Sequence, residues 1–139
     1  MREIAVVTGA SSGIGAATAK ALAASGYEVI AAARRTDRLA ELAKNNESIT
    51  PVELDVTDQK SVDALANSLK GKPVAILINN AGGAFDSETV LDSDPKVWSD
   101  TYEVNVVGAV RMTKAITPDR KSTRLNSSHV ALSRMPSSA

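Results

Sequence analysis

The sequence predicts an α/β domain with a doubly wound, parallel β-sheet, because short apolar runs alternate with helical patterns along most of the chain. The apolar runs lack a polar face, which is typical of parallel strands that helices cover on both sides. A third observation is a group of three glycines between the first apolar run and the first helical pattern. Sheets of this class bind ligands at the carboxyl ends of their strands.

The first half of the predicted sheet follows from the order of these runs. Ile4 to Val7 predicts a buried strand, and a helix follows from about Gly13 to Ser25, where Gly26 ends it. Glu28 to Ala33 predicts the second strand, and Arg38 to Lys44 predicts the second helix. We expect right-handed crossovers between these parallel strands.

The second half continues the alternation and ends in a long helix. Ile49 to Leu54 predicts the third strand, and Thr57-Asp58 can cap the helix that follows. Val74 to Ile78 predicts the fourth strand, and Pro95 suits the start of the last helix. The apolar residues expected along that helix are Trp98, Tyr102, Val106, Val107, Val110 and Met112.

Composition limits the classes of function. The 139 residues suit one domain, and sixteen basic residues balance sixteen acidic ones, so we expect no nucleic-acid partner and no membrane partner. The chain has no cysteine, and its sole histidine, His129, has no second ligand beside it, so we expect no metal site. Met1-Arg2-Glu3 leads directly into the first strand and no apolar run has membrane-span length, which predicts a cytoplasmic protein.

The character of the sequence changes at Pro118. Residues 119–139 contain six serines and no sustained apolar period, so we predict a domain over residues 1–118 and a disordered tail over 119–139. The tail also resembles a peptide translated from the adapters of sequencing libraries, which implies a non-native segment. Asn126-Ser127-Ser128 lies within this tail, and because no apolar strand precedes that string, we expect it to carry no function.

The glycine-rich turn spans Thr8 to Gly15 and has the spacing Gly-x3-Gly-x-Gly. Glycine permits positive φ at a tight turn, and the absence of Cβ atoms lets a pyrophosphate approach the backbone. The following helix start offers unpaired N–H groups to an anion. The segment therefore predicts a phosphate-binding loop, with a ligand-free glycine turn as the alternative.

Two motifs together resemble the short-chain dehydrogenase/reductase family. They are Thr-Gly-x3-Gly-Ile-Gly and Asn79-Asn80-Ala81-Gly82, the latter of which alone would also suit an ordinary turn. The resemblance implies a Rossmann-like fold truncated after about four strands and a nicotinamide dinucleotide as cofactor. The cofactor-binding residues that it implies in these motifs are Gly9, Ser11, Ser12, Gly13, Ile14, Gly15, Asn80, Ala81 and Gly82.

The ends of the second and third strands predict how the adenosine is held. Arg34 and Arg35 offer guanidinium donors to a 2′-phosphate where an acidic residue would accept from a 2′-hydroxyl, so NADP is preferred to NAD. The alternative is a pair of arginines on a solvated loop. The resemblance implies that Asp55, followed by Val56, accepts a hydrogen bond from the adenine amino group, although a turn or capping role also suits Asp55.

The catalytic half of the family's site is not found in the sequence. The resemblance implies that Asn105 supports a proton relay beside a catalytic lysine, whereas an ordinary surface asparagine is the alternative. The family pairs a tyrosine with a lysine four residues later and uses a serine to orient the substrate. The two tyrosines, Tyr27 and Tyr102, are followed at that spacing by Ala31 and Val106, so we expect these 139 residues to be inactive.

The resemblance implies an NADP(H)-dependent oxidoreductase that acts on a small carbonyl or alcohol, with a homo-oligomeric full-length parent. Gly-Tyr-Glu-Val-Ile-Ala followed by Ala-Arg-Arg is similar to NADP-dependent 3-hydroxy acid dehydrogenases. Two alternatives remain for the chain as written. It is a non-catalytic nucleotide-binding fragment, or it pairs with other subunits through the apolar side of its last helix, beside an uncovered fourth strand.

Overall fold

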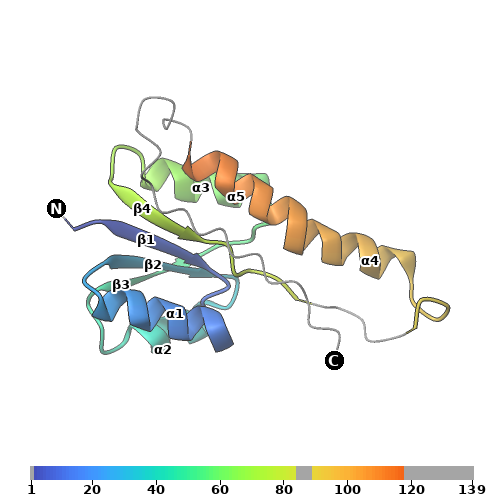
Figure 1. Ribbon diagram of the computed structural model, residues 1–139, viewed down its shortest axis with the longest axis horizontal. Helices are drawn as coiled ribbons and strands as arrows, with labels where there is room; N and C mark the ends of the chain where they lie inside the picture. Colours follow the sequence, from blue (N-terminus) through green and yellow to red (C-terminus); the bar gives the residue numbers. More distant parts are fainter. Residues whose placement is uncertain (1, 84–88, 118–139) are drawn as a thin grey trace.

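A computed structural model describes residues 2–83 and 89–117, and the predicted tail at 119–139 lies outside them. The described chain forms one parallel sheet in the order β3-β2-β1-β4 (Figure 1). Its strands are β1 (Ile4–Thr8), β2 (Glu28–Ala33), β3 (Ile49–Glu53) and β4 (Val74–Ile78). The α/β class with a parallel sheet, predicted from the alternation of apolar runs, is confirmed.

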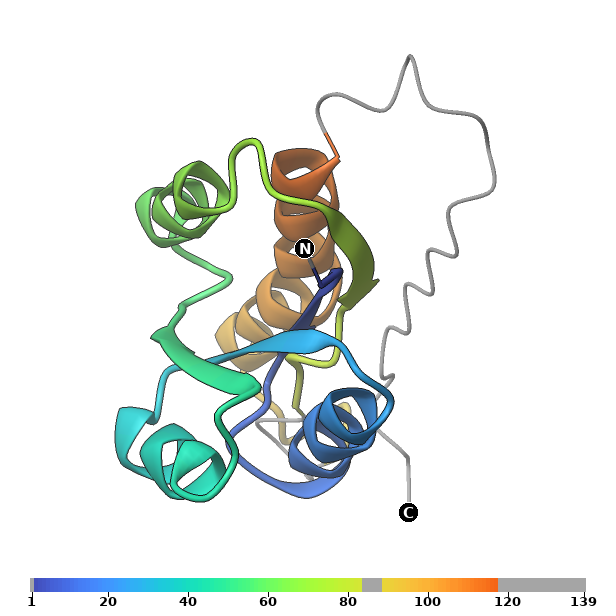
Figure 2. The same ribbon diagram turned by 90° about the vertical axis from the view of Figure 1, so that its left-hand side faces the viewer.

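Helices cover both faces of this sheet, as the two views show (Figures 1 and 2). One face carries α1 and α2, and the other carries α3 and α5. The helical segments are α1 (Gly13–Ala24), α2 (Thr36–Ala43), α3 (Gln59–Ser68), α4 (Pro95–Tyr102), the π-helical turn η1 (Glu103–Val107) and α5 (Gly108–Ile116).

Two apolar layers hold the helices to the sheet. Val62 of α3 and Met112 of α5 pack with Val6 and Leu77 on one face, and Leu39 of α2 packs with alanines and valines on the other. All five residues of β1 are buried. This arrangement explains why the central strand β1 is apolar without alternation, since helices cover it on both sides.

Capping aspartates mark the starts of two helices, α3 and α4. Asp58 caps α3 by accepting from the Lys60 N–H at 3.0 Å, and Asp94 caps α4 by accepting from the Lys96 N–H at 2.8 Å. Helix α2 begins at Thr36, two residues before the predicted Arg38. Such differences of one or two residues are common at helix ends.

The last helix differs from the prediction in one respect. It runs from Pro95 to Ile116, but the π turn η1 interrupts it between α4 and α5. Met112 is fully buried, whereas four of the other apolar residues expected along this helix are exposed. They are Trp98, Tyr102, Val106 and Val110.

The two edge strands differ in chemistry. β3 carries Pro51, which has no N–H to offer a further strand and is tolerated at an edge. β4 has no strand on its outer side among residues 2–83 and 89–117. No helix in this described part of the chain is long and apolar enough to span a membrane.

Candidate cofactor site

The glycine-rich turn joins β1 to α1 and leaves no room for side chains at two of its glycines. Gly9 has a φ of +62°, and a Cβ there would lie 2.9 Å from the Cα of Ala81. A Cβ on Gly15 would lie 2.3 Å from the carbonyl oxygen of Gly9. Because the loop folds tightly on itself and on the β4 end, only glycine fits at these positions.

The start of α1 presents a favourable surface for an anion. Gly13 has a φ of +56° and the first turn of α1 contains no acidic residue. The side chain of the N-cap residue, Ser12, makes no capping hydrogen bond. The first N–H groups of this helix are therefore not masked by a carboxylate, and the helix dipole is positive here.

Thr8 links the glycine loop to the end of β4. Its buried hydroxyl accepts hydrogen bonds from the N–H groups of Asn80 and Ala81 at 3.0 and 2.9 Å, and it donates to the Ile78 carbonyl at 3.3 Å. The Asn80 amide donates in return to the Gly9 carbonyl at 3.1 Å. Thr8 belongs to the predicted loop motif, but its link to β4 was not predicted, although a threonine that ends an otherwise apolar strand is a signal for such a role.

Asp55 lies in the loop after β3 and is held by Thr57, two residues later. Its Oδ1 accepts from the Thr57 N–H at 2.9 Å and from the Thr57 hydroxyl at 2.7 Å. The hydroxyl hydrogen bond, opposed in part by burial, holds the pKa of Asp55 below its ordinary value, and the charges of Arg34 and Arg111 add to this effect. Oδ2 makes no hydrogen bond to any described residue, so this oxygen can accept from a ligand. The turn role weighed from sequence is therefore present, and it leaves the ligand role open.

These segments meet around one open pocket at the carboxyl edge of the sheet. Arg34 and Arg35, which are exposed after β2, line the same pocket as Asp55 and Val56. The pocket is lined by Gly9, Ser11, Ser12, Gly13, Ala32, Ala33, Arg34, Arg35, Leu54, Asp55, Val56, Asn80, Ala81, Gly82 and Val104.

Two of the predicted cofactor-binding residues do not line this pocket. Ile14 is 58% exposed, and Gly15 is buried beneath the loop, where it allows close packing. Four apolar residues do line it although the sequence analysis did not include them, namely Ala32, Ala33, Leu54 and Val104. Each of the four lies within two residues of a predicted site residue. An apolar residue type does not by itself distinguish the lining of a pocket from the core, so these residues could not be assigned to the pocket from sequence.

Asn105 is buried within η1, which contradicts the surface alternative. Its amide donates to the Gly83 carbonyl at 2.7 Å and to the Thr101 carbonyl at 2.8 Å, while its Oδ1 accepts from the Gly83 N–H at 3.2 Å. A side chain that bonds the carbonyl four residues earlier competes with the helix backbone, which gives a physical reason for the π turn here. Asn105 thereby fixes the chain that follows the pocket residue Gly82.

A parallel sheet with a glycine loop and a polar pocket at its carboxyl edge defines the Rossmann-like class of dinucleotide-binding folds. A family model described as short chain dehydrogenase matches residues 3–127, and the chain belongs to this family.

Known relatives agree with this assignment. An uncharacterized oxidoreductase of Mycobacterium tuberculosis is 49% identical over 117 residues, which cover 84% of this chain and 45% of the relative. The NADP-dependent 3-hydroxy acid dehydrogenase of Schizosaccharomyces pombe is 38% identical over 121 residues, covering 81% of this chain and 47% of that protein. The chain thus spans about half the length of the curated relatives that it matches.

Solved structures show the same likeness. A closed form of serine dehydrogenase complexed with NADP+ matches with a TM-score of 0.78 and 32% identity, covering 84% of this chain and 48% of that one. A short-chain dehydrogenase from Streptomyces avermitilis matches with a TM-score of 0.78 and 35% identity, covering 85% of this chain and 44% of that one.

Proposed function

We propose that the full-length protein is an NADP(H)-dependent oxidoreductase and that these 139 residues hold the adenosine 2′-phosphate end of its cofactor. The observation that carries the proposal is the presence of two arginines, Arg34 and Arg35, in the same pocket as the glycine loop. A guanidinium forms paired hydrogen bonds with a phosphate, whereas the 2′-hydroxyl of NAD calls for an acceptor. The NADP+ complex of a structurally similar serine dehydrogenase supports this choice.

The pocket residues divide the cofactor among them. The loop from Gly9 to Gly13 and the start of α1 face the pyrophosphate, and Arg34 and Arg35 face the 2′-phosphate. Oδ2 of Asp55 accepts from the adenine amino group, with Val56 beside it, and the segment Asn80 to Gly82 leads toward the nicotinamide side. A bound nicotinamide supplies the group that gives or takes the hydride.

The substrate class that we propose is a small carbonyl or alcohol, in particular a 3-hydroxy acid. Support comes from the names of two similar proteins, an NADP-dependent 3-hydroxy acid dehydrogenase and a serine dehydrogenase, serine being itself a 3-hydroxy acid. The residues of this chain that carry the resemblance, such as Arg34, belong to the cofactor pocket, so the substrate is inferred from the relatives alone.

We further propose that the 139 residues bind cofactor without turnover. A tyrosine needs a nearby cation to lower its pKa enough for acid–base work near neutrality. Neither tyrosine has a lysine four residues later, and Tyr102 is exposed on the last helix, away from the pocket lining. Asn105 would support proton transfer only once the family's tyrosine and lysine are present.

A pair of measurements tests these proposals. Calorimetric titration of the chain should show NADP binding more tightly than NAD, and NADPH should not be oxidised with a panel of ketones and aldehydes. Equal affinity for the two cofactors would contradict the assignment of Arg34 and Arg35. If the chain oxidised NADPH, and the variant Asn105→Ala did not, the proposal that the chain is inactive would be overturned.

The exposed side of the last helix supports a second proposal, that it contacts another subunit in the full-length homo-oligomer. Trp98 and Tyr102 are 57% and 60% exposed, and Val106 and Val110 continue the same apolar stripe. Size-exclusion chromatography of this chain mixed with a full-length relative should then show co-elution, which Trp98→Glu should weaken. An unchanged elution of the relative would count against the contact.

A further inference from the structure

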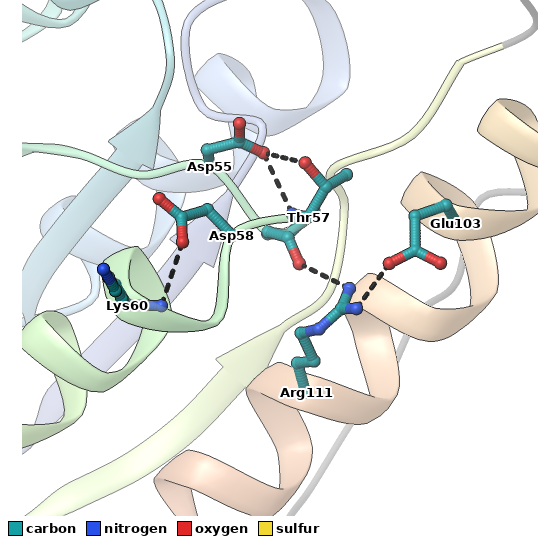
Figure 3. A network of polar contacts seen from close by, with 7 residues as sticks. Asp55, Thr57, Asp58, Lys60, Glu103 and Arg111 are labelled. Carbon is teal, nitrogen blue, oxygen red and sulfur yellow. Dashed lines mark hydrogen bonds and ion pairs between the residues drawn. The ribbon is translucent and has the colours of Figure 1, made fainter.

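Arg111 joins the last helix to the loop that follows β3. Its Nη1 donates to the Val56 carbonyl at 3.3 Å, and its Nη2 lies 2.5 Å from Oε1 of Glu103 (Figure 3). The Arg111 side chain is only 22% exposed and that of Glu103 38%, so the pair is more shielded from solvent than an ordinary surface ion pair. Val56 lines the cofactor pocket, whereas neither Arg111 nor Glu103 does.

The π turn explains how Glu103 reaches Arg111. The two residues are eight positions apart, and in a regular helix about 7.2 residues complete two turns, so they would not be aligned. A π turn accommodates about one extra residue in a turn. Because η1 begins at Glu103 and ends before α5, eight positions bring the chain round about two whole turns and place both side chains on one side of the helix.

Val56 is held by the last helix at a second point. Gly108 is buried beneath it, and a Cβ added to Gly108 would lie 2.6 Å from Cγ2 of Val56. Gly108 and Arg111 are three positions apart and therefore share a face of α5. The helix thus fixes the Val56 side chain by contact with Gly108 and the Val56 carbonyl by the guanidinium of Arg111.

The position of Val56 determines where Asp55 directs its free oxygen. Thr57 occupies Oδ1 of Asp55, so only Oδ2 remains for a ligand. The three residues are consecutive, and Arg111 is the described side chain that bonds the backbone carbonyl between Asp55 and Thr57. A shift of this carbonyl would move both the carboxylate and its hydroxyl partner.

We propose that Arg111, held by Glu103 across the π turn, is a positioning residue that sets the Asp55–Val56 segment for recognition of the adenine amino group. This inference rests on the proposed function, since it assumes that the pocket binds an adenine dinucleotide. Arg111 acts through Val56 and does not touch the ligand. Loss of its contacts is therefore expected to reduce discrimination between bases more than attraction of the cofactor's phosphates.

The test compares NADP with its hypoxanthine analogue, in which an oxygen replaces the adenine amino group. The affinities of both nucleotides for the full 139-residue chain are measured by calorimetry. We expect the unmodified chain to prefer NADP by about tenfold, the effect of one hydrogen bond to a charged acceptor. In Arg111→Met this ratio should fall to about twofold or less, and in Glu103→Gln it should fall part of the way.

Lys114→Met is the matched control. It removes the same charge from an exposed position of the same helix and should keep the ratio of the unmodified chain. Arg111→Lys keeps the charge but cannot bond Glu103 and Val56 through a planar fork, so we expect only partial rescue. If Arg111→Met does not fold, Glu103→Gln decides, since it leaves Arg111 in place.

The outcomes separate this inference from the proposed function. An unchanged ratio in Arg111→Met, or equal weakening of both nucleotides, would overturn the positioning role and leave NADP binding intact. Equal affinity of the unmodified chain for both nucleotides would also overturn it, because Asp55 would then not recognise the amino group. Failure of the unmodified chain to bind either nucleotide would overturn the proposed function and this inference with it.

Discussion

The hydroxyl oxygen of Thr8 lies 3.0 Å from the backbone nitrogen of Asn80, although 72 residues separate them in the sequence. With the Asn80 amide bonded back to Gly9, this contact locks the glycine loop to the end of the neighbouring strand. The two family motifs therefore form one structural unit.

Thr8→Val should destabilise the fold, because it removes the acceptor of the Ala81 N–H and leaves the Asn80 N–H with the Ile78 carbonyl alone. We expect a loss of about 2 kcal/mol in the free energy of unfolding, measured by urea denaturation. Thr8→Ser keeps the hydroxyl and should lose much less. Equal losses in the two variants would show that the hydroxyl is not what matters at this position.

Gly15→Ala should damage both the fold and nucleotide binding, since its Cβ would lie 2.3 Å from the Gly9 carbonyl oxygen. Backbone must move to relieve this overlap, at a cost of about 1–3 kcal/mol or more in stability. Gly83→Ala is the control, because a Cβ there meets nothing within 4 Å. Urea unfolding and NADP titration of both variants check the prediction, and full tolerance of Gly15→Ala would refute the packing argument.

Arg34→Ala should lower the affinity for NADP by about tenfold and leave that for NAD nearly unchanged. The reason is that only NADP carries the 2′-phosphate that the exposed guanidinium would meet. Arg38→Ala removes the same charge from an exposed position that does not line the pocket. Calorimetry on both variants separates a specific contact from a general effect of charge, and equal weakening of NADP and NAD would contradict it.

The lowered pKa of Asp55 predicts a pH dependence of stability. A carboxyl whose pKa is lower in the folded than in the unfolded chain stabilises the fold above its unfolded pKa, and this contribution is lost as pH falls below about 4. Thr57→Val removes the hydroxyl hydrogen bond that contributes most to the lowering. It should therefore reduce the stability difference between about pH 6 and about pH 3. Thr18→Val should leave this difference unchanged, because the Thr18 hydroxyl bonds the Ile14 carbonyl and not Asp55.

Much of the fold could be predicted because β1, β2 and β4 consist mostly of apolar residues and are each followed by glycine or polar residues. Val74–Ile78 was predicted with the bounds that the structure gives. The π turn could not be predicted in the same way, since Glu103 to Val107 carry an ordinary helical pattern. The turn follows from the buried contacts of Asn105 with Gly83 and Thr101, which depend on tertiary structure.

The candidate site could likewise be predicted only in part. Motifs predicted the glycine loop and the segment Asn80 to Gly82, because their backbone geometry depends on residue types that are close in sequence. The contacts of Thr8 and Arg111 were not predicted, because their partners are 72 and 55 positions away in the sequence. Contacts of that kind depend on strand order and helix rotation, which apolar periodicity alone does not determine.

NADP binding at this pocket can be tested residue by residue in an NMR titration of the 15N-labelled chain. We expect amide shift changes at Gly9 to Gly13, Arg34 and Arg35, Asp55 and Val56, and Asn80 to Gly82, with Trp98 unaffected on the exposed side of the last helix. Shift changes confined to other surfaces, or none at saturating NADP, would contradict it.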